Sequence, residues 1–65
     1  MPRYFFHVHL DGTLEPDVVG LELADLRVAI VCAHRARAEI MSEDTVAQLR
    51  LEITDENGRT LAKIE

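Results

Sequence analysis

The fold is decided by the stretch LRLEITDENGRTLAKI, residues 49–64. Apolar residues alternate with polar ones from Leu49 to Ile53, a period that predicts a strand with one buried face. Asp55–Gly58 is a turn sequence, in which Gly58 takes the positive-φ position. Arg59–Ile64 then returns as a second strand. A four-residue loop predicts three facing pairs that keep one face apolar: Ile53–Thr60, Leu51–Ala62 and Leu49–Ile64.

A helix is predicted directly before this hairpin. Asp25 is a good N-cap, and neither proline nor glycine interrupts the chain from there to Met41. Ser42-Glu43-Asp44 signals the end. Arg37 lies within the apolar stripe, where only its long aliphatic stem makes it tolerable. The stripe itself should lie on the sheet and consists of Leu26, Ala29, Ile30, Ala33, Ala36, Ile40 and Met41.

A first hairpin is predicted at the N-terminal end of the chain. In the strand Tyr4–Leu10 the even-numbered residues are the more apolar, which assigns Tyr4, Phe6, Val8 and Leu10 to the core. Asp11-Gly12 predicts a tight turn, after which Thr13–Glu15 returns as far as Pro16. This turn pairs Leu14 with His9 and directs Leu14 away from the core. Val18–Leu23 is extended and continues the second strand past a bend at Gly20.

These elements sum to β-β-α-β-β, an α+β two-layer sandwich in which one helix packs on one face of a small antiparallel sheet. We expect residues 1–65 to form one domain. A chain of 65 residues buries only about 60 % of its unfolded surface. Its core is therefore thin, and a lone monomer would be stable by only ~3–5 kcal/mol.

Composition excludes several classes of protein. The net charge of −5 argues against non-specific nucleic-acid binding, which depends on lysine and arginine contacts to phosphates. The longest apolar run, Val28–Ala33, is too short to span a bilayer, so no membrane partner is expected. Cys32 is the only cysteine, which rules out an internal disulfide and fits a reducing compartment. We therefore expect a cytoplasmic protein.

Two parts of the sequence carry a resemblance to a known family. The opening part comprises Pro2-Arg3-Tyr4-Phe5-Phe6-His7, Asp11-Gly12 and Gly20-Leu21-Glu22-Leu23, and the closing part is Glu52–Arg59. Together they resemble the short alphaproteobacterial proteins classified as domain of unknown function 6894. The resemblance implies a bacterial, cytoplasmic, stand-alone domain and carries no catalytic residues. The helix departs from the family, which tends to be rich in alanine, glutamate and arginine where this chain has Ile30-Val31-Cys32.

His7 and His9 are the candidate metal ligands. They are two residues apart on a strand, so both side chains project from one face and could form half of a zinc or nickel site. Asp11 or Glu15 could complete it. No further ligand spacing supports a site, however, and polar residues are ordinary on the solvent face of an antiparallel strand. We expect no metal and no other cofactor.

The sequence offers no catalytic constellation. Cys32 would need a base nearby, but His34 is two positions away on the helix and lies on another face. Because no nucleophile, base and oxyanion group can be assembled, we expect that the protein is not an enzyme. RNA binding would rely on Phe5 with Arg3, His7 and His9, and the acidic balance of the chain argues against it.

The sequence is best interpreted as a non-enzymatic interaction domain that forms a homodimer. On a helical wheel with Leu26 at zero, Val31 lies at roughly 140° and Val28 at roughly 200°, away from the sheet-facing stripe. Val28, Val31 and Cys32 are therefore candidate interface residues, and pairing through edge strands is the competing interface. Two alternatives stay open: a partner-binding regulatory module that resembles small antitoxins, and a metal- or ligand-binding protein that uses His7 and His9.

Overall fold

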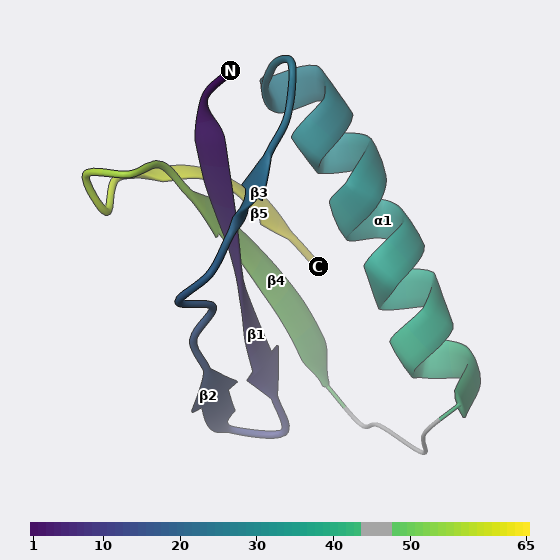
Figure 1. Cartoon of the computed structure of the whole chain (residues 1–65). Helices are drawn as coiled ribbons and strands as arrows, with labels where there is room; N and C mark the ends of the chain where they lie inside the picture. The colour runs from purple at the N-terminus through teal and green to yellow at the C-terminus, as the bar shows by residue number, and fades with distance from the viewer. Residues whose placement is uncertain (44–47) are drawn as a thin grey trace.

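One helix packs on one face of a five-stranded antiparallel sheet (Figure 1), in a computed structural model that describes residues 1–43 and 48–65. The α+β class predicted from the sequence is confirmed. Asp44, the last residue of the predicted helix end, lies outside the described residues. The elements are β1 (Arg3–Leu10), β2 (Thr13–Glu15), β3 (Leu21–Glu22), α1 (Leu26–Glu43), β4 (Leu49–Thr54) and β5 (Thr60–Ile64).

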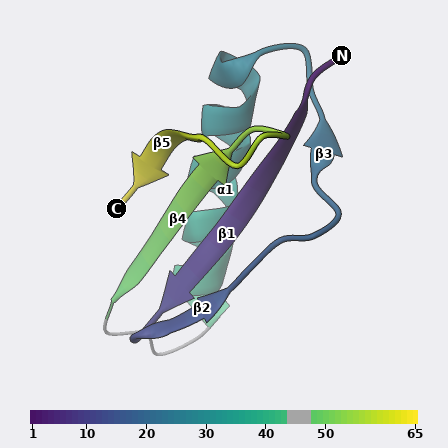
Figure 2. The same cartoon turned by 90° about the vertical axis from the view of Figure 1, so that its left-hand side faces the viewer.

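β1 and β4 are the central strands of the sheet. The strand order is β2-β1-β4-β5, and β3 pairs with β1 beyond the end of β2. β2 and β3 therefore lie along the same edge of β1, separated by residues 16–20 (Figure 2). This confirms that the extended segment continues the second strand past a bend, although only Leu21 and Glu22 pair.

The first hairpin has the predicted two-residue turn. Leu14 faces His9, and Leu10 faces Thr13. The turn needs positive φ at both central positions, where Asp11 has φ 48° and Gly12 has φ 87°. Leu14 consequently projects from the sheet face opposite the helix and stays exposed, as expected.

The predicted register of the second hairpin is wrong by two residues. Ile53 faces Ala62 and Leu51 faces Ile64, because the chain takes five residues to turn from Thr54 to Thr60 and then inserts one more as a β-bulge. The turn is held by Asp55, whose carboxylate accepts the N–H of Arg59 and whose own N–H donates to the Arg59 carbonyl. Gly58 takes the predicted positive φ, at 82°.

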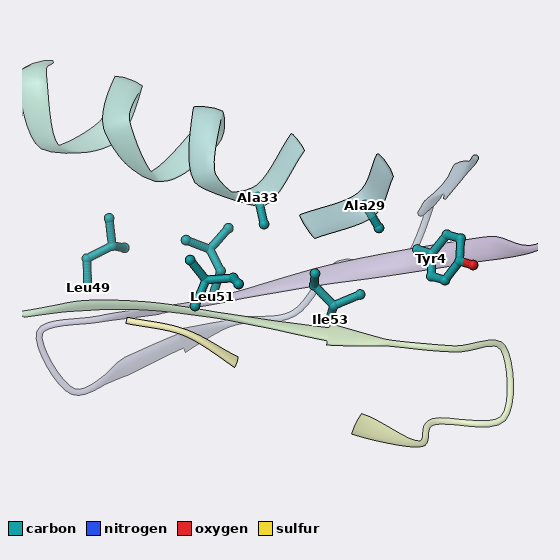
Figure 3. Packing of buried hydrophobic residues seen from close by; sticks show 7 residues of the cluster. Tyr4, Ala29, Ala33, Leu49, Leu51 and Ile53 are labelled. Carbon is teal, nitrogen blue, oxygen red and sulfur yellow. The ribbon is translucent and has the colours of Figure 1, made fainter. Parts of the chain in front are cut away.

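The helix begins at the predicted N-cap. Oδ1 of Asp25 accepts the backbone N–H of Val28 at 3.0 Å, which satisfies one of the free donors of the first turn. On the sheet-facing side, Ala29 and Ala33 have no exposed surface. Their small side chains let the helix backbone lie close to β4 (Figure 3).

The core is small and lies under the helix, mainly over β4. The three helix-facing residues of β4 are buried, whereas Phe6, Val8 and Leu10 on β1 are only partly buried against them. Among the residues that the structure describes, only Leu51 and Ile53 are both large and fully buried. Within residues 1–43 and 48–65, the buried hydrophobic residues are Tyr4, Ala29, Ala33, Leu49, Leu51, Ile53 and Ile64.

Candidate functional site

The polar side chains of β1 and β4 gather on the sheet face opposite α1, the face toward the viewer in Figure 2. Successive side chains of a strand alternate between the two faces. Tyr4, Phe6 and Val8 face the helix, so His7 and His9 project from the other side. Across from them on β4 stand Glu52 and Arg50. We refer to this surface as the open face.

His7 is held by hydrogen bonds at both ring nitrogens. Nδ1 accepts the backbone N–H of Asp17 at 3.0 Å, and Nε2 lies 2.9 Å from Oγ1 of Thr54. Because a backbone N–H can only donate, Nδ1 carries no proton here and Nε2–H donates to Thr54. Neither nitrogen is free to bind a metal without losing one of these bonds.

Asp17 organises the segment between β2 and β3. Its Oδ2 accepts the N–H of Phe6 at 3.1 Å, and its Oδ1 accepts the N–H groups of Val19 and Gly20 at 3.0 and 3.1 Å. Burial alone would raise the pKa of Asp17, but the hydrogen bonds from these three donors outweigh it and lower the pKa below its ordinary value of 3.8. The carboxylate thus replaces the strand partner that β1 lacks at Phe6.

Gly20 closes this segment, which we call the Asp17–Gly20 loop. Its φ is +72°, and a Cβ placed there would lie 2.9 Å from Cγ of Arg3, from Cε2 of Phe5 and from the carbonyl oxygen of Tyr4. Only glycine fits, because both the backbone conformation and the space exclude a side chain. The loop is therefore fastened against β1 at Phe5, Phe6 and His7.

His9 belongs to a second cluster on the open face. Its Nε2 lies 3.3 Å from Oε1 of Glu52, and the hydroxyl of Thr60 on β5 donates to Oε2 of the same carboxylate. The Thr60 hydrogen bond, followed by that of His9, lowers the pKa of Glu52 below its ordinary value of 4.5. Glu52 therefore bridges β1, β4 and β5.

The proposed third metal ligands do not join the two histidines. Glu15 faces Val8 and lies on the helix side of the sheet, so its assignment was wrong. Oδ1 of Asp11 instead accepts the N–H of Gln48 at 2.8 Å. Among residues 1–43 and 48–65, no group of three or more histidine, cysteine, aspartate or glutamate side chains is placed to hold a metal ion.

The residues that the sequence suggested for an interface lie on the back of α1. Val28 is 38 % exposed and Val31 is 47 % exposed, whereas Cys32 is partly buried. The most exposed apolar side chains of the Asp17–Gly20 loop, Val18 at 83 % and Val19 at 71 %, were not considered. Asp17 and Gly20 make the contacts of this loop with β1, and residue type alone does not reveal that Val18 and Val19 are left exposed between them.

The fold and the open face define a small α+β domain in which His7, His9 and Glu52 are hydrogen-bonded to neighbouring segments of the sheet. The chain belongs to the family described as domain of unknown function DUF6894, which matches residues 3–65. This confirms the family inferred from the opening and closing motifs. Neither the curated proteins nor the solved structures contain a match. Within the described residues, no helix is long and apolar enough to cross a membrane.

Proposed function

We propose that this chain is a non-enzymatic interaction domain that acts as a homodimer in the bacterial cytoplasm. One observation carries the proposal: Leu51 and Ile53 are the only large side chains that the described residues bury completely. A core of this size leaves a lone chain with little margin over the entropy of folding. A second copy would bury more apolar surface, at roughly 25 cal/mol per Å².

The bonding on the open face supports a role without catalysis. A general base works best when its pKa lies near the working pH. The carboxylate of Asp17 accepts three backbone N–H groups and that of Glu52 is hydrogen-bonded to His9 and Thr60, and these bonds lower both pKa values, which makes the two carboxylates weaker bases. These groups connect strands of the sheet, so each has a structural role that accounts for its position.

Two surfaces are available for self-association. One is the back of α1, where Val28 and Val31 are exposed beside the partly buried Cys32. The other is an edge of the sheet, where backbone groups lack a strand partner. A homodimer normally has two-fold symmetry, so either surface would meet its own copy.

Multi-angle light scattering tests the proposal. The wild-type chain should have twice the 7.3 kDa mass of one copy. A Val31→Glu variant, compared at the same concentration, separates the two surfaces: its dissociation would assign the interface to the helix. A wild-type chain of single mass at near-millimolar concentration would contradict the proposed homodimer.

A further inference from the structure

The two edges of the sheet differ in how they are protected. On one edge, β2 has three residues and β3 has two, and Pro16 and the Asp17–Gly20 loop interrupt them. Short strands, proline and loops are the usual means of preventing edge pairing. On the other edge, β5 has five residues and pairs with β4 alone among the described elements (Figure 2).

The free backbone groups of β5 can be identified from the pairing. Phe6 donates its N–H to Asp17, away from β4, so the neighbouring residue His7 directs its N–H and C=O toward β4. His7 faces Glu52, whose backbone groups therefore point to β1. Lys63 faces Glu52 from the other side, and its N–H and C=O consequently point away from the sheet.

We propose that β5 pairs antiparallel with β5 of a second copy, about a two-fold axis perpendicular to the sheet. This inference rests on the proposed homodimer and identifies its interface. The pairing would join two five-stranded sheets into one continuous sheet with both helices on the same face. It would also provide hydrogen-bond partners for the backbone of Lys63 in each copy.

The same edge asymmetry limits the assembly to two copies. A two-fold pair uses both β5 edges, and the outer edges of the joined sheet are then the interrupted β2 and β3. A closed dimer therefore follows, rather than an open fibre.

A pair of proline variants tests this interface by light scattering. Lys63→Pro removes an N–H that points away from β4, so the sheet of one copy stays intact while pairing with a second copy is blocked. Leu14→Pro is the matched control on the opposite edge of the sheet. Leu10 and Thr13 form the hydrogen-bonded pair that closes the β1–β2 turn, so the backbone groups of Thr13 point toward β1. The N–H of the next residue, Leu14, therefore points away from the sheet, as the N–H of Lys63 does.

We expect single mass for Lys63→Pro and twice that mass for the wild type and Leu14→Pro, with cooperative thermal unfolding in all three. Dimers in all three chains, or monomers in both variants, would overturn the β5 interface and leave the homodimer standing. A monomeric wild type would overturn both.

Amide hydrogen exchange tests the interface without any substitution. In a single copy the N–H of Lys63 faces solvent, and in the proposed dimer it is hydrogen-bonded. Its exchange in the wild-type chain should slow at least tenfold between a dilute and a concentrated sample, whereas the N–H of Leu14 should show no such change. Equal exchange of the Lys63 amide at both concentrations would contradict the β5 interface.

Discussion

The backbone N–H of Asp17 donates to Nδ1 of His7 at 3.0 Å, while the Asp17 carboxylate accepts the N–H of Phe6, the residue before His7. This reciprocal contact holds the Asp17–Gly20 loop against β1 where neither β2 nor β3 pairs with that strand. Asp17, which lies between β2 and β3, thus makes hydrogen bonds to β1 that a strand residue would otherwise make. The loop is part of the sheet edge and contributes to its stability.

Replacement of Asp17 should destabilise the fold. Asp17→Ala leaves the N–H groups of Phe6, Val19 and Gly20 without their acceptor, and the part-buried Phe6 N–H carries most of the loss. We expect a loss of about 1–3 kcal/mol in the free energy of unfolding, measured by urea denaturation. Asp17→Asn, which keeps one side-chain oxygen, should lose less. Equal stability of Asp17→Ala and the wild type would show that the loop is not held by this carboxylate.

Acid should destabilise the protein through the same groups. The pKa values of Asp17, Glu52 and Asp55 are lowered in the folded chain from ordinary values of 3.8, 4.5 and 3.8. A carboxylate with a lowered folded pKa contributes stability above its unfolded pKa, and this contribution is lost as the pH falls through the folded value. The free energy of unfolding should therefore decline below about pH 4.5, with a shallower decline in Asp17→Ala. A stability that is constant from pH 6 to pH 2.5 would contradict this.

Substitution by alanine should destabilise the fold more at Gly20 than at Gly58, although both glycines have positive φ. Gly20→Ala and Gly58→Ala both place a side chain at positive φ, which costs about 1–2 kcal/mol. At Gly58 the added Cβ meets open space, whereas at Gly20 it lies 2.9 Å from three atoms of β1 residues. Thermal unfolding should therefore show a larger loss for Gly20→Ala. An equal loss of thermal stability in both variants would mean that Gly20 does not pack closely against Arg3 and Phe5.

The purified protein should contain no stoichiometric zinc or nickel. Both ring nitrogens of His7 are hydrogen-bonded, and Nε2 of His9 lies beside Glu52. Plasma mass spectrometry of metal content provides the measurement. One equivalent of metal that is lost in a His7→Ala, His9→Ala double variant would support the metal-binding alternative instead.

The alternation from Leu49 to Ile53 made β4 predictable, because burial on one face demands a period of two. The register of β4 with β5 was not predictable in the same way. A shift of two residues keeps Ala62 and Ile64 on the helix side, so the hydrophobic pattern fits the predicted and the observed pairing equally well. The bulge that decides between them depends on how Asp55 holds Arg59.

The candidate site was predictable only in part. The sequence placed His7 and His9 on one face, and the strand geometry confirms this. Their partners were missed because they come from other segments: Asp17 from the loop after β2, and Thr54 and Glu52 from β4. Such contacts depend on which strands become neighbours, and residue type at one position does not contain that information.

The most direct test of the central claim is the dependence of thermal unfolding on protein concentration. If the stability of a chain with so small a core depends on a second copy, unfolding separates the copies and the Tm becomes concentration-dependent. We predict that the Tm of the wild-type chain rises by several degrees across a hundredfold increase in concentration, and that the Tm of Lys63→Pro stays constant. A wild-type Tm that is the same at every concentration would contradict the homodimer.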